Sequence, residues 1–238
     1  MSQEQQLDAR SHAYLFGAIA KNVIDTFGEA GIEAVGNGVV HYGRQRGKRM
    51  ALRAQADGVE LTALNYIAYG EWSAREGEMD FSVPTKDPDI QFFIKKCPWH
   101  DLWQEEGWLE AYGYLYCKYV DVAIAAGYNP ELVFDIVECR GLGDPVCDMR
   151  LLQANVSSME EEKFAERVRL LGNKVKMPWN YHCGHLFKAL WEVVIARFGY
   201  SGFQAMQESL DLFAKRYGAE AVEQILEFMN QDFNDLPQ

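Results

Sequence analysis

The chain has 238 residues, of which 48% are apolar and 13% aromatic, and its formal net charge at pH 7 is -12. This length and apolar content predict a globular protein with a substantial core. The acidic excess disfavours nucleic acid and anionic membranes as partners, and no apolar stretch is long enough to span a bilayer. The polar first ten residues lack a secretion signal, and the five scattered cysteines are typical of reduced thiols, so we expect a cytoplasmic protein.

The first quarter of the chain is predicted to be helical. In residues 12–27 the apolar positions recur every three or four residues, which predicts an amphipathic helix that Gly28 interrupts. A second helix is expected over residues 32–42 and a third over residues 47–56, where Asp57-Gly58 ends it.

The central part changes to a period of two, which is typical of strands. We predict strands over residues 66–72, 89–97, 132–136 and 146–152, and a helix over residues 109–126. Two hairpins therefore bracket one helix. Short connections favour antiparallel pairing, so the fold class is α+β, with a four-stranded antiparallel sheet (strand-strand-helix-strand-strand) flanked by helical hairpins at both ends of the chain.

The chain beyond Gln153 is predicted to be helical to its end. Ser157 or Ser158 precedes a run of acidic residues and is the expected N-cap of the first of these helices. We expect two domains: an α+β core over residues 1–155 and a helical extension over residues 156–238.

This extension contains a segment whose sequence is similar to that of the N-terminal helix pair. At an offset of 171 positions, Phe198-Gly199 corresponds to Phe27-Gly28, and Gly202 corresponds to Gly31. A duplicated helical hairpin would explain the match. The alternative is that any two amphipathic helices joined at a glycine would align equally well.

The candidate catalytic residues are Cys117, His100, Asp121 and Glu138. Cys117 is the candidate nucleophile or pocket wall, and Asp121 follows it by one helical turn on the same face. His100 is the only histidine in the central region and a candidate proton shuttle. Glu138 continues the apolar alternation of its strand, which predicts a desolvated carboxylate with a raised pKa. The alternatives are that the strand frays first or that an arginine pairs with Glu138.

Aromatic residues concentrate around these candidates, and most of them must belong to the core. Trp and Tyr also line small-molecule pockets, so we predict a substrate-binding set of Tyr69, Trp72, Cys97, Trp99, Trp103 and Tyr116. No cysteine pair has the spacing of a zinc clamp, and we predict no metal. His182 and His185 are expected to be solvated at a helix start.

Four short motifs in the central part belong together. They are Lys96-Cys97-Pro98-Trp99, Tyr116-Cys117-Lys118-Tyr119-Val120-Asp121, Gly127-Tyr128-Asn129-Pro130 and Gly143-Asp144-Pro145-Val146-Cys147. Together they resemble the L-2-amino-thiazoline-4-carboxylic acid hydrolase family over about residues 14–153. The glycine turn that ends at Cys147 is also similar to 4-vinyl-reductase-type small-molecule-binding domains, which implies the same antiparallel fold.

The resemblance implies hydrolysis that opens a C–N or C–S bond of a small heterocycle, with Cys97, Cys117, Asp121, Asp144 and Cys147 on the family pattern. We expect no cofactor and a small cyclic or aromatic substrate. Two alternatives are a lyase that acts on a phenolic or lignin-type compound by general acid-base chemistry, and a non-catalytic small-molecule-binding domain. The apolar helix faces at both ends of the chain are compatible with a homodimer.

Overall fold

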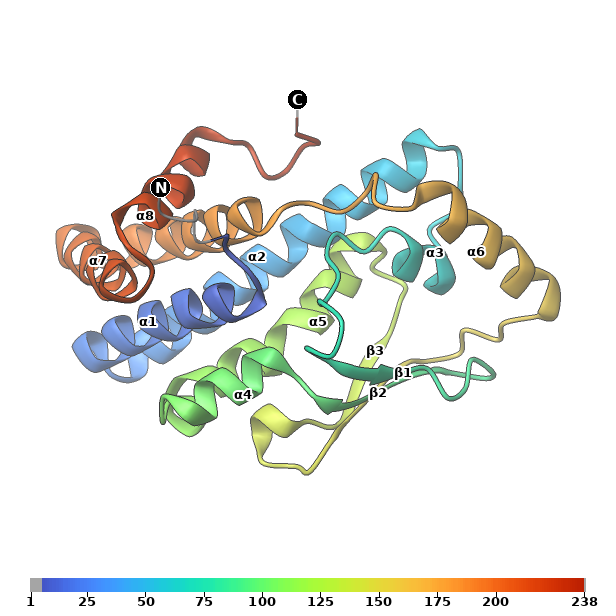
Figure 1. Ribbon diagram of the computed structural model, residues 1–238, viewed down its shortest axis with the longest axis horizontal. Coiled ribbons are helices and arrows are strands. Elements are labelled where there is room, and N and C mark those ends of the chain that lie inside the picture. Colours follow the sequence, from blue (N-terminus) through green and yellow to red (C-terminus); the bar gives the residue numbers. More distant parts are fainter. Residues whose placement is uncertain (1–5, 238) are drawn as a thin grey trace. The chain divides into compact units, whose positions relative to one another are not determined.

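The computed structural model describes residues 6–237 and shows an α+β protein (Figure 1). Its helices are α1 (Ala9–Phe27), α2 (Glu29–Ala56), α3 (Ala63–Ala68), α4 (Pro98–Glu105), α5 (Tyr114–Tyr128), α6 (Ser158–Leu171), α7 (Trp179–Tyr217) and α8 (Ala219–Leu226). Its strands are β1 (Asp80–Ser82), β2 (Ile90–Lys96), β3 (Phe134–Glu138) and β4 (Cys147–Leu151). One π-helical turn, η1 (Leu109–Gly113), precedes α5, and two 3-10 turns are η2 (Arg140–Leu142) and η3 (Glu227–Asn230).

The chain forms two compact units. Unit 1 contains the chain up to Tyr42, Pro98–Tyr119 and Pro178–Gln231, and unit 2 contains Gly43–Cys97, Val120–Met177 and Asp232–Gln238. Each unit draws on residues before and after 155, so their compactness does not test the predicted domain boundary.

Unit 1 is helical, and α1 packs along α7 within it (Figure 1). The carboxylate of Asp8 caps α1 by accepting the backbone N–H of Ser11. Helix α7 contains one residue with non-helical dihedrals, Gly199 (φ 55°, ψ -128°). Gly28, at the junction of α1 and α2, has nearly the same dihedrals (φ 57°, ψ -133°). Only glycine adopts this conformation without strain, so both helix pairs bend at a glycine.

The segments that are 171 positions apart match in further details. The rings of Phe27 and Phe198 stack on each other, with centroids 3.8 Å apart and planes at 1°. A Cβ at Gly31 would lie 2.5 Å from the carbonyl oxygen of Val23, and a Cβ at Gly202 would lie 2.8 Å from that of Val194. These matched features support the duplicated hairpin, which stays a proposal.

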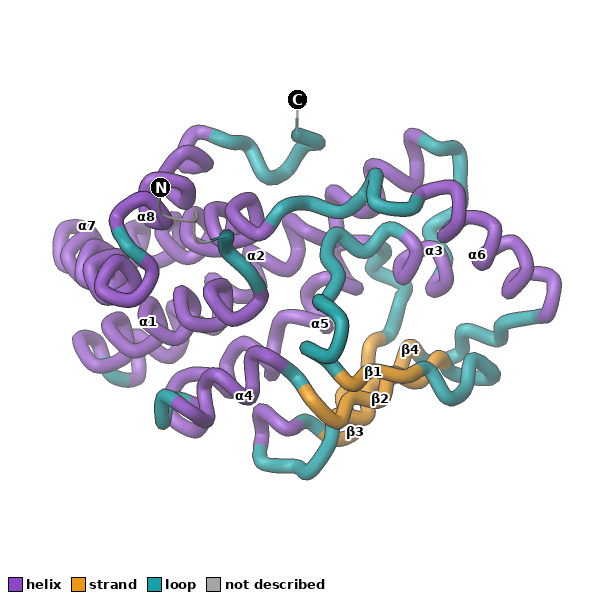
Figure 2. The backbone as a smooth tube through the Cα atoms, in the orientation of Figure 1, coloured by secondary structure: helices purple, strands orange, loops and turns teal. Residues whose placement is uncertain are grey.

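Unit 2 contains the sheet, whose strand order is β1-β2-β4-β3 with every neighbouring pair antiparallel (Figure 2). The four-stranded antiparallel sheet of the predicted α+β fold is thus confirmed. Alternate residues of the two central strands form its buried face: Ile90, Phe92 and Ile94 from β2, and Cys147, Met149 and Leu151 from β4.

The first strand lies elsewhere than the sequence pattern predicts. Residues 63–68 form α3 because the Thr62 hydroxyl caps its first turn by accepting the Asn65 N–H. The first strand of the sheet is the exposed three-residue β1. A short aromatic run does not distinguish a strand from a buried helix, since both patterns fit it equally well.

Helix α2 is also longer than predicted, because its glycines do not break it. A Cβ at Gly43 would lie 2.6 Å from the Cβ of Ala123, and a Cβ at Gly47 would lie 2.0 Å from the carbonyl oxygen of Ile124. Both glycines therefore allow the close approach of α2 to the C-terminal part of α5, and α2 continues without interruption from Glu29 to Ala56.

Candidate functional site

Three arginines of α2 surround one buried carboxylate in unit 2. Glu71 has no exposed side-chain surface and accepts two hydrogen bonds from Arg49, at 3.1 and 2.8 Å, and one from Arg53 at 2.6 Å. The Nε atom of Arg46 lies 3.6 Å from Glu71 Oε2. Three positive charges therefore face one negative charge in an interior where charge is costly to bury.

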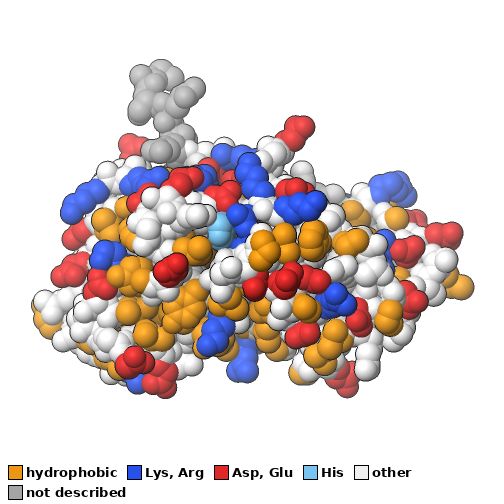
Figure 3. All heavy atoms as spheres, turned by 90° about the horizontal axis from the view of Figure 1, so that it is seen from below, with side chains coloured by type: hydrophobic (Ala, Val, Ile, Leu, Met, Phe, Trp, Pro, Cys, Tyr) orange, Lys and Arg blue, Asp and Glu red, His pale blue; other side chains and the backbone are white. Residues whose placement is uncertain are grey.

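Further groups hold this arginine cluster (Arg46, Arg49, Arg53 and Glu71) in place. Arg49 donates a third hydrogen bond to the carbonyl oxygen of Phe233 at 2.8 Å. Lys176 donates to the carbonyl oxygen of Gly70 at 2.6 Å, and burial followed by the charge of Arg46 lowers the Lys176 pKa. Lys176 therefore adds a fourth basic side chain beside the three arginines. On the face of the molecule in Figure 3, acidic, basic and hydrophobic side chains are interspersed.

Asp121 of α5 faces this positive charge. Burial raises the pKa of its carboxyl to about 6, although the charge of Arg46 opposes the shift. The residue as a whole is half-buried. A carboxylate with a pKa near 6 is ionised at pH 7 and still basic enough to accept a proton in a reaction.

Tyr66 and two cysteines share the neighbourhood of Asp121. Burial and the charge of Asp121 raise the pKa of Tyr66, so its hydroxyl stays a donor. A hydrogen bond with Cys139, burial and the charge of Asp121 all raise the pKa of the Cys147 thiol. We call Asp121, Tyr66, Arg46 and the Cys139–Cys147 pair the Asp121 cluster.

A second polar cluster lies in unit 1 around His12. The His12 ring is buried, its Nδ1 atom accepts the indole N–H of Trp99 at 3.1 Å, and its Nε2 atom lies 3.1 Å from the hydroxyl of Tyr42. Because indole can only donate, Nδ1 carries no proton and His12 is neutral. Four aromatic rings lie 5.8–5.9 Å from the His12 ring: Tyr42, Trp99, Tyr116 and Trp179.

The ten predicted site residues divide equally between the two units. Unit 1 contains Cys117, His100, Trp99, Trp103 and Tyr116, and unit 2 contains Asp121, Glu138, Tyr69, Trp72 and Cys97. Trp99 and Tyr116 belong to the His12 cluster, and the Trp103 ring lies 5.8 Å from that of Tyr116.

Several of these residues have structural partners. Cys117 is half-buried on α5. The Nδ1 atom of His100 lies 3.2 Å from Oδ1 of Asp101. Trp103 is fully buried and donates its indole N–H to the carbonyl oxygen of Ala13. Tyr69 is fully buried and donates its hydroxyl to Asp57 at 2.6 Å. Cys97 and Trp72 are half-buried. Their roles in catalysis and binding stay predictions.

Glu138 lies where the pairing of β3 becomes irregular. The register of β3 shifts between Ile136 and Glu138, so that Ile136 pairs with Met149 but Glu138 pairs with Asp148. Glu138 is half-buried, as are Phe134 and Ile136, whereas Asp135 and Val137 are exposed. The predicted role of Glu138 in catalysis stays a prediction.

The prediction for His182 and His185 is also corrected. Both are buried, at 1% and 0% exposure, in the first turns of α7. The ring of His185 lies 4.5 Å from that of Tyr42. The two histidines belong to the aromatic interior of unit 1, because the start of α7 is covered by other parts of that unit.

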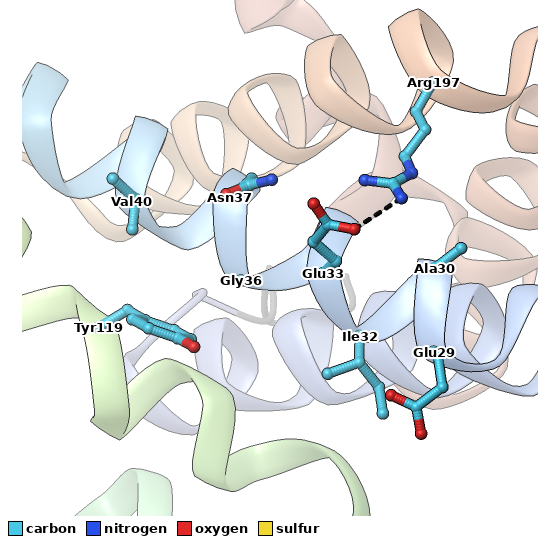
Figure 4. Close-up of a pocket in the computed structure, with 9 residues that line it drawn as sticks. All are labelled: Glu29, Ala30, Ile32, Glu33, Gly36, Asn37, Val40, Tyr119 and Arg197. Carbon is cyan, nitrogen blue, oxygen red and sulfur yellow. Dashed lines mark hydrogen bonds and ion pairs between the residues drawn. The ribbon is translucent and has the colours of Figure 1, made fainter.

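An open groove of about 520 Å³ lies elsewhere in unit 1 (Figure 4). Its lining residues are Glu29, Ala30, Ile32, Glu33, Gly36, Asn37, Val40, Tyr119 and Arg197. Arg197 closes one side through an ion pair with Glu33 at 2.7 Å. None of the predicted site residues lines this groove.

Comparison with known families identifies the chain. The model of the L-2-amino-thiazoline-4-carboxylic acid hydrolase family matches residues 8–151, which is more than half of the chain. The protein belongs to this family. Comparisons with curated proteins and with solved structures gave no match.

The match to the L-2-amino-thiazoline-4-carboxylic acid hydrolase family includes every residue of the Asp121 cluster and ends at the last residue of β4. Within residues 6–237, no three His, Cys, Asp or Glu side chains are grouped to hold a metal ion. In the same residues we find no helix with the length and apolarity of a membrane span.

Sequence reasoning missed the arginine cluster and His12. Arg46, Arg49 and Arg53 follow each other at three- and four-residue steps, so one face of α2 presents all three. His12 precedes Phe16 and Ile19 on the apolar stripe of α1. Both spacings can be recognised in the sequence, but only the structure shows that these helix faces are buried.

Proposed function

We propose that this protein hydrolyses a small heterocyclic compound, opening a C–N or C–S bond, and that Asp121 is the general base. Asp121 is a half-buried residue whose carboxyl has a pKa of about 6, and it lies inside the segment that matches the hydrolase family; this observation carries the proposal. A general base works best when its pKa lies near the working pH, and Asp121 is tuned toward that value by burial.

The reaction follows from these groups. Asp121 accepts a proton from a water molecule while the water oxygen bonds to the ring carbon between nitrogen and sulfur. The ring C–N or C–S bond then breaks, and the protonated Asp121 returns its proton to the leaving nitrogen or sulfur. The hydroxyl of Tyr66, which burial keeps protonated, is a donor for the developing charge. No cofactor takes part in this scheme.

The arginine cluster supports an acidic substrate, as the family name also suggests. The Nη2 atom of Arg53 is buried, and among the described residues it has no hydrogen-bond partner. A buried cationic donor that lacks a partner is costly, and a substrate carboxylate would satisfy it. We assign Arg53 to substrate binding on this basis.

The roles of Cys117, His100 and the predicted aromatic wall remain part of the proposal. Cys117 lies four residues before Asp121 on α5, which keeps covalent catalysis by its thiol open. A lyase that uses acid-base chemistry alone would tolerate the loss of this thiol.

The test is hydrolysis of L-2-amino-thiazoline-4-carboxylate by the wild type and by four variants, with products identified by mass spectrometry. We expect Asp121→Asn to lower kcat by about 10²–10⁴-fold and Arg53→Gln to raise KM with little effect on kcat. Cys117→Ala and Cys117→Ser decide whether the thiol is the nucleophile, since unchanged rates would exclude it.

Three results would contradict the proposal. Full activity of a folded Asp121→Asn variant would remove the general base. A product formed without addition of water would favour the lyase. Ligand-induced stabilisation without any product, across a panel of heterocycles and phenolic compounds, would favour a binding domain.

A further inference from the structure

Cys139 and Cys147 lie opposite each other where the β3–β4 hairpin leaves the sheet. The last pair of the ladder is Glu138 with Asp148, so the next positions outward on the two strands are Cys139 and Cys147. Opposed residues in antiparallel strands have Cα atoms about 4.5–5.5 Å apart. A disulfide bond requires about 4.4–6.8 Å, so the backbone spacing of such a pair suits one.

Hydrogen bonds fix the backbone of Cys139 where the turn begins. Its N–H donates to Asp144 Oδ2 at 2.8 Å, and its carbonyl oxygen accepts from the N–H groups of Leu142 and Asp144. The 3-10 turn η2 follows directly, and the chain re-enters the sheet at Cys147. The short turn therefore brings the two cysteines back to neighbouring strands.

The two thiols also interact directly. A hydrogen bond with Cys139 is the largest cause of the raised pKa of Cys147, and the Arg140 N–H donates to Cys147 Sγ at 3.4 Å. Both side chains are buried, at 2% and 7% exposure. The turn between them is not, since Leu142 is 48% exposed and Gly143 and Pro145 are exposed as well. Local opening of this short turn is enough to admit a small reagent.

We propose that Cys139 and Cys147 are a reversible disulfide site that responds to low-molecular-weight disulfides such as glutathione disulfide. One protein thiolate attacks a sulfur of glutathione disulfide, forming a mixed disulfide and releasing one glutathione thiolate. The second protein sulfur then attacks the mixed disulfide, forms the Cys139–Cys147 bond and releases the second glutathione. The two protons of the protein thiols end on the two glutathione molecules, and the glutathione disulfide is reduced.

The bond would alter the surroundings of the Asp121 carboxyl in the Asp121 cluster. It replaces a contact between two thiols by a sulfur–sulfur bond of about 2.05 Å, and it ties the ends of the turn that carries Asp144. The charge of Asp121 acts on Cys147, so the two sites are close enough to influence each other. We therefore expect oxidation to change the hydrolysis rate, a consequence that rests on the proposed function.

The experiment equilibrates the full chain in glutathione buffers of increasing disulfide content, quenches with acid, alkylates the free thiols and analyses peptides by mass spectrometry. We expect the oxidised protein to lose two alkyl groups and to yield a peptide pair linked through Cys139 and Cys147. Cys139→Ser and Cys147→Ser should each abolish the linked pair. Cys183→Ser, a matched change at a buried cysteine of unit 1, should leave it intact.

The outcomes separate this inference from the proposed function. Alkylation of both cysteines in the most oxidising buffer, or a linkage to Cys97, Cys117 or Cys183 instead, overturns the disulfide site. Equal hydrolysis rates of the reduced and oxidised forms overturn the expected effect of the disulfide bond on the Asp121 cluster. A protein that forms the linked pair but hydrolyses no substrate contradicts the hydrolase assignment alone.

Discussion

The His12 cluster and the arginine cluster are both buried polar groups, but they are balanced differently. The two ring nitrogens of His12 are matched by one indole and one hydroxyl, and the ring is neutral. In the arginine cluster, three guanidinium groups surround the carboxylate of Glu71, and the buried Nη2 atom of Arg53 has no hydrogen-bond partner among the described residues. A fully hydrogen-bonded network stabilises a core, whereas an unsatisfied buried donor is better explained by a ligand that completes it.

The largest effect is expected at Asp121, on which the charge of Arg46 in the arginine cluster acts. We expect Asp121→Asn to lower kcat by about 10²–10⁴-fold, the usual contribution of general acid-base catalysis, with an unchanged circular dichroism spectrum. The measurement is steady-state hydrolysis of the family substrate. Asp135→Asn, the same change at an exposed carboxylate of β3, is the matched control; an equal loss in both variants would contradict the assignment.

The next largest effect is expected at Glu71. Glu71→Gln leaves three cations around a neutral amide, so we expect the free energy of unfolding to fall by about 3–5 kcal/mol. Urea denaturation measures this change. The control is Glu33→Gln, which breaks an exposed ion pair with Arg197 and should barely move the midpoint. Equal midpoints for the two variants would show that the buried charges are not coupled.

The pH dependence of stability tests the environment of Asp121. Its pKa in the folded protein is raised from 3.8 to about 6, so in this window the folded chain binds more protons than the unfolded chain. The contribution of Asp121 to stability is thus greatest below about pH 4 and declines as the pH rises through about 6. The difference in unfolding free energy between wild type and Asp121→Asn should decline over the same window; a constant difference would contradict the raised pKa.

The smallest effect is expected in the His12 cluster. Trp99→Phe keeps the aromatic packing but removes the donor to His12 Nδ1, which should lower the free energy of unfolding by about 1–3 kcal/mol and leave KM unchanged. Trp191→Phe, at a partly exposed tryptophan, is the control. An increased KM with unchanged stability would instead support Trp99 as a substrate-binding residue.

The elements with strong periodicity were predictable from the sequence. The helix α1, the strands β2, β3 and β4 and the N-cap Ser157 all follow from local patterns. The continuity of α2 was not predictable, because Gly43 and Gly47 serve contacts with α5 that no local pattern reveals. The strand predicted over residues 66–72 was wrong, because residues 66–68 end α3 and a short aromatic run fits a helix and a strand equally well.

The candidate site was predictable only in part. Asp121 was identified from its spacing to Cys117, but its raised pKa comes from burial in unit 2, against the opposing charge of Arg46. The register shift of β3 between Ile136 and Glu138 was not predictable, because no local pattern in the sequence marks it. The arginine cluster was missed because arginines on a helix are usually solvated.

The sequence by itself determined the acidic charge, the antiparallel α+β pattern and the family motifs, since each depends on residue types and short spacings. Only the tertiary structure decided which polar residues are buried and with what partners. Burial controls the energy of a charge and depends on segments far apart in the chain. Glu71 lies 18 to 25 residues after the arginines that surround it, and no local pattern connects them.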